Sequence, residues 1–149
     1  MSHKRLLLPM VGLALVTLLL VACATPQPTA TTTTMEVTFD GSGCVYDGPE
    51  SVSAGQVTLI FNNQSEGLAL VDFVKLAEGK TWNDILDYLG PLPSSKTRPD
   101  WVTGPAPEEV PAGESSSREL SVTGGNYVVV CARSSPLEVW PAGVLMVED

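Results

Sequence analysis

The stretch "NYVVVCARSSPLEVWPAG", residues 126–143, decides the fold of this chain and the chemistry open to it. Its first half follows a glycine turn and is rich in β-branched residues, so Asn126–Ala132 are predicted to form a strand. Its second half is interrupted by prolines and is predicted to be a loop before a last strand, Gly143–Glu148. Cys131 therefore lies at the end of a late strand, where it can be a metal ligand, a nucleophile or half of a disulfide.

The rest of the chain upstream alternates β-rich runs with turn residues, except for one stretch of helical periodicity. Trp82, Ile85 and Leu89 recur at helical spacing, which predicts a short helix over Thr81–Leu89. The segment Gly90–Gly113 is rich in proline and is predicted to be a long surface connection. Together these patterns predict an all-β, Greek-key β-sandwich with one short helix. The other predicted strands are Val37–Phe39, Cys44–Tyr46, Gln56–Asn62, Leu68–Leu76 and Ser116–Val122.

The N-terminus has the features of an export signal. A basic start is followed by an apolar core that is short for a membrane-spanning helix. It ends in "LVAC", Leu20–Cys23, which resembles the lipobox of bacterial lipoproteins. This resemblance implies that residues 1–22 are a signal peptide, removed before Cys23, and that Cys23 carries acyl chains such as palmitate. The alternatives are a signal anchor or an ordinary cleaved secretory peptide.

The residues after Cys23 divide into a tether and one domain. Residues 23–34 contain threonine and proline but little apolar surface, so they are predicted to be an extended tether. Residues 35–149 are enough for one domain with a single core. The expected location is the cell membrane or the outer membrane, with the domain lipid-anchored and facing outside the cytoplasm.

The charge of the chain argues against a nucleic-acid partner. It has 8 Lys and Arg against 17 Asp and Glu, a formal net charge of −9. Such a chain repels phosphate backbones and anionic lipid surfaces. The expected partners are therefore the membrane, through the lipid anchor, and a protein or small molecule whose identity the sequence does not give.

Two cysteines, Cys44 and Cys131, remain once Cys23 is assigned to the lipid. An even number of cysteines in an exported chain favours a disulfide. This bridge would close most of the domain into one loop, which is worth about 4 to 5 kcal/mol in the chain-entropy model. The alternative is two free thiols.

The order of these elements resembles that of the cupredoxins, β-sandwiches that carry one copper ion. The matching segments are "GQVTLIFNNQSEG", a strand, a helix after "LAEGKT", "VPAGESSSRELSV" and "GGNYVVVCARSSPLEVWPAGVLMVED", and the resemblance covers Met35–Asp149. It implies that Cys131 stands where the family has its copper cysteine. The family's histidines would stand near Leu68 and Trp140 and its methionine near Val144, yet none of these positions keeps a ligand. The one histidine of the chain, His3, lies in the leader, so no blue-copper site, metal or other cofactor is expected.

The lack of histidine after the leader also argues against the common catalytic arrangements. Neither a Ser-His-Asp nor a Cys-His pair can form, and neighbouring carboxylates such as Asp84 and Asp87 are typical of a solvated helix face. The chain is therefore not expected to be an enzyme. A binding surface is predicted instead, where Leu68, Trp140 and the proline-rich connection with Trp101 would converge.

These features lead to one hypothesis and one rival. The hypothesis is a lipid-anchored, extracytoplasmic cupredoxin-like domain without blue copper that works as a non-catalytic binding or interaction module. The rival is a redox protein. It would be either a copper carrier that uses Cys44, Cys131 and a methionine such as Met35 or Met146, or a thiol-disulfide switch built on the two cysteines.

Overall fold

The computed structural model describes residues 32–149. The predictions for the signal peptide, 1–22, and for lipidation at Cys23 lie outside the described residues. Strand β1 (Thr33–Phe39) begins within the segment assigned to the tether, because Thr33 and Thr34 pair with Val57 and Thr58 of β4. Within the described part of the chain, no helix is long and apolar enough to cross a bilayer.

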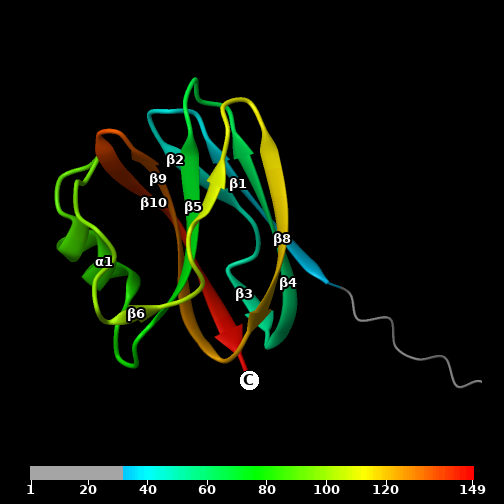
Figure 1. Ribbon diagram of the computed structural model, residues 1–149. Helices are drawn as coiled ribbons and strands as arrows, with labels where there is room; N and C mark the ends of the chain where they lie inside the picture. Colours follow the sequence, from blue (N-terminus) through cyan, green and yellow to red (C-terminus); the bar gives the residue numbers. More distant parts are fainter. Residues whose placement is uncertain (1–31) are drawn as a thin grey trace, which may run out of the picture. The chain divides into compact units, whose positions relative to one another are not determined.

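Two β-sheets pack face to face, and the one helix of residues 32–149 lies outside one of them (Figure 1). One sheet has the strand order β2-β1-β4-β8, and the other has the order β3-β10-β9-β5-β6, with β7 also paired to β5. This arrangement confirms the predicted all-β sandwich with one short helix. The remaining strands are β2 (Cys44–Asp47), β3 (Ser51–Ser53), β4 (Gly55–Asn63), β5 (Ala69–Leu76), β6 (Val102–Thr103), β7 (Glu108–Val110), β8 (Ser115–Val122), β9 (Gly125–Ser134) and β10 (Leu137–Glu148).

The main core fills the space between the two sheets. Alternate residues of each strand point inward, as the two-residue period of a strand requires. In β1 and β4 the buried inward residues are apolar except for Asn63 at the end of β4, and burial of each apolar side chain contributes roughly 1.5 to 3 kcal/mol. The large side chains of this core include Met35, Phe39, Phe61, Phe73, Tyr127, Trp140 and Leu145.

A second, smaller core lies on the outer face of the six-stranded sheet, under helix α1 (Trp82–Leu89). The Thr81 side chain caps the helix by accepting from the Asp84 backbone N–H, and the Asp84 carboxylate accepts from the Thr81 N–H in return. Gly90 ends it with a positive φ of 72°. The predicted helix is thus confirmed. Its apolar side covers the outward residues of the sheet, and this second core comprises Val74, Leu76, Ile85, Leu89, Val102, Val128 and Val139.

The last strand differs from the sequence prediction. Strand β10 starts at Leu137 instead of Gly143 and forms a long antiparallel hairpin with β9. The prediction was wrong because it took the prolines of this stretch as loop residues. Pro141 instead lies beside a register shift between Pro141 and Gly143, where the ladder does not need its missing N–H. Gly143 is needed at this bulge, since a Cβ there would lie 2.7 Å from Cγ of Tyr46.

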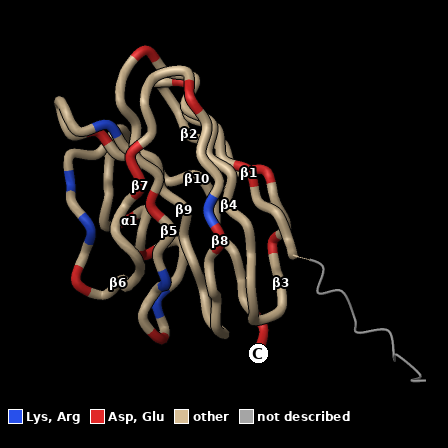
Figure 2. Tube along the Cα trace, turned by 45° about the vertical axis from the view of Figure 1, so that its right-hand side comes forward, with Lys and Arg blue, Asp and Glu red and all other residues tan. Residues whose placement is uncertain are grey.

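Charges are distributed unevenly over the surface. Asp and Glu occur all around the tube in Figure 2, whereas most Lys and Arg lie on the side of α1 and β6. The side with the second core is therefore the less acidic side of an acidic chain.

Candidate functional site

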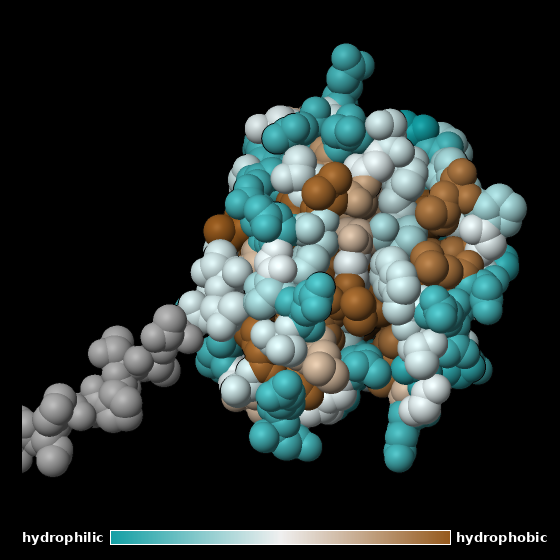
Figure 3. Space-filling model, turned by 180° about the vertical axis from the view of Figure 1, so that it is seen from behind, coloured by the Kyte–Doolittle hydropathy of each residue, from teal (hydrophilic) through white to brown (hydrophobic). Residues whose placement is uncertain are grey.

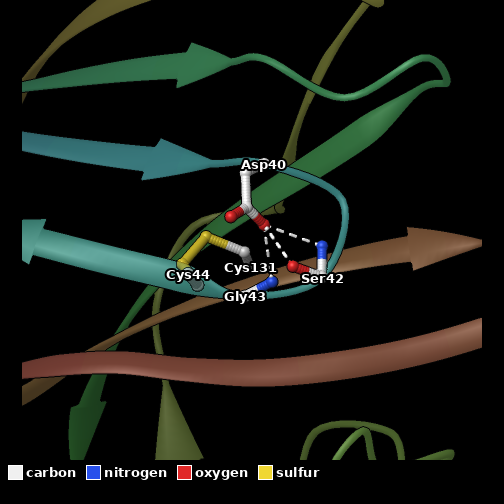
Figure 4. The surroundings of a disulfide bond; sticks show 5 residues. All are labelled: Asp40, Ser42, Gly43, Cys44 and Cys131. Carbon is white, nitrogen blue, oxygen red and sulfur yellow. Dashed lines mark hydrogen bonds between the residues drawn. A yellow bond between two sulfur atoms is a disulfide. The ribbon is translucent and has the colours of Figure 1, made fainter.

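A disulfide joins the two sheets at one end of the sandwich (Figure 4). Cys44 opens β2 in the four-stranded sheet, and Cys131 lies in β9 of the six-stranded sheet. Their Cα atoms are 5.9 Å apart, and the bond spans 87 residues of sequence. The two cysteines that the sequence pairs are thus bonded. Since both sulfurs are in the bond, neither is a thiolate that could bind a metal or attack a substrate.

The turn before Cys44 is fixed by one carboxylate. The Oδ1 atom of Asp40 accepts hydrogen bonds from the N–H and hydroxyl of Ser42 and from the N–H of Gly43, at 2.8 to 2.9 Å (Figure 4). The hydrogen bonds from Ser42 are the main reason that the pKa of Asp40 is lowered. This carboxylate therefore shapes the β1–β2 turn and the approach to the disulfide.

A buried asparagine holds the neighbouring turn between β4 and β5. The Asn63 side chain is 1% exposed, and its Nδ2 donates to the carbonyl oxygens of Gly67, Val110 and Pro111 at 2.8 to 2.9 Å. Its Oδ1 accepts from the N–H and hydroxyl of Ser65. A single amide thus connects the turn before Leu68 to the end of β7.

The three predicted surface residues do not converge. Trp140 is 7% exposed and belongs to the main core, since it lies on a strand and not in a loop. Leu68 is 42% exposed and directly precedes β5. Trp101 lies at the other end of this strand, where its backbone carbonyl accepts from the N–H of Ala77, the residue after β5. The length of that strand, roughly 25 Å, separates Leu68 from Trp101. The prediction that Leu68, Trp101 and Trp140 form one binding surface is therefore wrong.

The methionines named for the copper-carrier alternative lie away from the disulfide. Met35 is fully buried in the main core. Met146 is 49% exposed and pairs with Asn126, at the far end of β9 from Cys131. Among residues 32–149, no group of three or more His, Cys, Asp and Glu side chains is placed to hold a metal ion.

A cavity of about 240 Å³ lies on the outer face of the six-stranded sheet. Its floor is formed by outward residues of β5, β9 and β10, and its roof by α1 and the proline-rich connection. In Figure 3, apolar side chains reach the surface among hydrophilic ones on the side that carries α1. The floor residues are Leu70, Val74, Val130, Ala132 and Val139, and the roof residues include Ile85, Tyr88, Leu89, Pro99 and Val102.

One ion pair ties the roof of this cavity to its floor. Arg98 of the connection donates to Asp72 of β5 from Nη2 at 2.5 Å and from Nε at 3.2 Å. Arg98 also donates to the carbonyl oxygens of Gly104 and Pro105. Burial raises the pKa of Asp72 more than the bonds to Arg98 lower it. The pair is therefore satisfied within the protein and holds the connection over the sheet.

The rim of the cavity carries a second cation. The hydroxyl of Tyr88 donates to the Thr97 carbonyl at 3.1 Å, which fixes the connection against the helix. The Lys96 ammonium lies 5.0 Å from the centre of the Tyr88 ring and donates to the Tyr88 carbonyl. In the described part of the chain Lys96 forms no ion pair, in contrast to Lys80, Arg98 and Arg133.

Residue patterns along the chain did not predict this cavity, although one signal was present. The outward face of β5 carries Leu70 and Val74, and both faces of a strand become apolar only where something covers the outer face. The apolar side of the helix indicates the cover. The volume of the cavity between the helix and the outward face of β5 depends on side-chain packing, which residue patterns do not specify.

Comparison with known proteins finds similarity among solved structures only. No family model matches the chain, and no curated protein matches it either. Among solved structures, the chain is similar to sodium-dithionite-reduced auracyanin from the photosynthetic bacterium Roseiflexus castenholzii, with a TM-score of 0.44 and 20% identity. The alignment covers 79% of this chain and 98% of that chain.

Proposed function

We propose that this chain is a lipid-anchored, extracytoplasmic cupredoxin-like domain without blue copper, and that it binds a small molecule without catalysing a reaction. The observation that carries the proposal is the apolar cavity between the six-stranded sheet and its helical cover. Apolar walls around open space lose contacts that a ligand of matching shape restores. The Asp72–Arg98 pair supports the same reading, because it keeps the roof at a fixed height above the floor.

The chemistry available elsewhere supports binding over catalysis or copper transfer. Cys131 occupies the position of the copper cysteine in the resemblance, but its sulfur is bonded to Cys44. The chain has one histidine, His3, which leaves with the predicted leader. A trigonal copper site needs two imidazoles and a free thiolate.

The proposed lipid anchor on Cys23 determines where binding takes place. Few residues separate Cys23 from Thr33, where the sandwich begins, so a lipid on Cys23 keeps the domain close to the bilayer surface. Small apolar molecules concentrate in bilayers, and a cavity held there meets them at high local concentration.

The proposal is tested by asking what the protein carries when it is purified. The full-length protein is expressed with its leader, isolated from membranes and analysed by native mass spectrometry. We expect a small molecule bound to the wild-type protein and lost in Ala132→Phe, whose ring fills the floor of the cavity. Val144→Phe is the matched control, because Val144 faces outward on the same sheet but does not line the cavity. Identical spectra for all three proteins would contradict the proposal.

A second candidate, a thiol-disulfide switch, is favoured by one observation. Cys44 is half-buried at the edge of its sheet, whereas Cys131 is fully buried. A small thiol could therefore reach one sulfur of the pair, and reduction would release the link between the sheets. Thiol titration in graded redox buffers decides this: a bridge that stays oxidised below about −300 mV is structural, and one that opens well above that potential is a switch.

A further inference from the structure

We propose that the ligand of the cavity is a small apolar carboxylic acid: its compact apolar body fills the cavity, and its carboxylate pairs with Lys96. This inference rests on the proposed binding function and names the ligand class.

The size and lining of the cavity determine the body of the ligand. A cavity of 150 Å³ lined by aliphatic side chains binds benzene, so about 240 Å³ accommodates roughly ten non-hydrogen atoms, the size of a bicyclic ring or a medium-length chain. Aliphatic side chains, prolines and the ring of Tyr88 form most of the floor and roof, and the polar lining residues are Asp72, Lys96, Thr97, Arg98 and Ser134. A charged or strongly polar body would be desolvated there without hydrogen-bond partners.

The charged groups that line the cavity are the Asp72–Arg98 ion pair and the ammonium of Lys96. The Asp72 carboxylate is matched by the Arg98 guanidinium, which also serves two backbone carbonyls. Because the two charges neutralise each other, the pair does not require a charged group from the ligand. A second charge in the interior would have no partner there. An ionic group of the ligand therefore lies at the rim and not at the floor.

Lys96 is the group at the rim that lacks an ionic partner. Its ammonium has three donors, and within the described residues one of them reaches the Tyr88 carbonyl. Lys80 and Arg133, by comparison, pair with Asp84 and Glu138. An acidic chain repels anions in general, so a cation left unpaired beside an apolar cavity is the feature that makes an anionic group favourable at this place.

The geometry favours a carboxylate over a larger anion. A single ammonium supplies one point charge, which matches a singly charged group, while phosphates are usually held by several donors or a guanidinium fork. The ligand thus combines one apolar body with one carboxylate, and each part has its own residue to test: Ala132 on the floor and Lys96 at the rim.

The test uses 2-naphthoate and 2-naphthol, which share a ten-carbon body but differ in charge at pH 7. Full-length protein in lipid nanodiscs is titrated with each compound by calorimetry, with empty nanodiscs as the blank. We expect one site for each compound, with 2-naphthol bound about fivefold more weakly. Lys96→Gln should weaken 2-naphthoate by about the same factor and leave 2-naphthol unchanged. Lys75→Gln, which removes a cation away from the cavity, should change neither.

Two variants test whether binding takes place in the cavity. Ala132→Phe and Leu70→Phe each fill the floor from a different strand, so one remains informative if the other does not fold. Both should abolish binding of both compounds, and their thermal unfolding should remain cooperative.

The outcomes separate this inference from the proposed function. Equal binding of 2-naphthol and 2-naphthoate, or an unchanged affinity in Lys96→Gln, overturns the carboxylate and leaves a binding cavity. Failure of both compounds to bind wild-type protein overturns the inference, while a native ligand that is lost in Ala132→Phe still upholds the proposed function. Unchanged binding in both filled variants overturns the cavity as the site.

Discussion

Trp140 of β10 lies directly opposite Cys131 of β9 in the antiparallel ladder, with both side chains in the main core. In the other sheet, Phe39 pairs in the same way with Cys44. The disulfide joins Cys44 to Cys131, and the rings of Phe39 and Trp140 lie 5.0 Å apart. These four residues therefore link the two sheets twice at the same place, once by the disulfide and once by the aromatic contact.

Removal of the disulfide should destabilise the domain strongly. In Cys44→Ala/Cys131→Ala, the unfolded chain regains the freedom of an 87-residue loop, and we expect the free energy of unfolding to fall by about 4 kcal/mol. Urea denaturation of the double variant and of oxidised wild type measures this. An unchanged midpoint would mean that the bond does not form in the protein.

The aromatic pair should depend on the disulfide. Trp140→Leu alone should cost about 2 to 3 kcal/mol of unfolding free energy, because it shrinks a buried ring. In the background without cysteines the same change should cost at least 0.5 kcal/mol less, since residues in contact do not contribute additively. A double-mutant cycle by urea denaturation gives the difference, and strict additivity would contradict the linkage.

Substitution of Asn63 should lower the free energy of unfolding more than substitution of its neighbour Asn62. Asn63→Ala leaves the buried carbonyl of Val110 and the part-buried carbonyl of Pro111 without their donor, which should cost about 2 to 3 kcal/mol. Asn62→Ala removes hydrogen bonds with Glu36 and Ser115 at the surface and should cost less than about 1 kcal/mol. Thermal or urea unfolding of both variants compares them, and equal losses would show that the turn does not depend on the buried amide.

The pH dependence of stability should differ between two aspartates. Because the pKa of Asp72 is raised in the folded state, folding favours its protonated form, and its contribution to stability is lost as pH rises through that pKa. Wild type should therefore gain stability relative to Asp72→Asn as pH falls from 7 to 4. Urea unfolding across this range measures the difference.

Asp84 provides the opposite sign as a control. Hydrogen bonds from Thr81 and Lys80 lower its pKa to about 2, so its contribution is present above the unfolded pKa and is lost as pH falls towards 2. Wild type should lose stability relative to Asp84→Asn over this acidic range. The same sign for both aspartates would contradict the assigned causes of the two shifts.

The proposed lipid anchor is tested at Cys23. Cys23→Ser removes the thiol that the acyl chains need, so the protein should no longer take up radiolabelled palmitate and should leave the membrane fraction. Cys44→Ser, which leaves Cys23 in place, is the control and should remain membrane-bound. Membrane association of Cys23→Ser would favour an uncleaved signal anchor.

Local sequence patterns were sufficient for most of the fold. Thr81 and Asp84 form the predicted cap, Gly90 ends the helix, and the inward residues of β1 and β4 follow a clear two-residue period. These features depend on neighbours along the chain, and therefore residue order reveals them.

The features that were missed depend on contacts between distant segments. Pro141 was read as a loop signal, yet a bulge in β10 accommodates it, and Trp140 was consequently placed at the surface. The cavity depends on how closely the connection approaches the sheet. That distance is set by the contact between Arg98 and Asp72, which lie 26 residues apart.

The disulfide also determines what happens when a protease cuts this domain. The connection between β5 and β8, with its exposed prolines, lies inside the segment bounded by Cys44 and Cys131. A single cut there yields two fragments that stay covalently joined, each retaining strands of the sandwich. Such a cut would open the roof of the cavity without separating the two fragments.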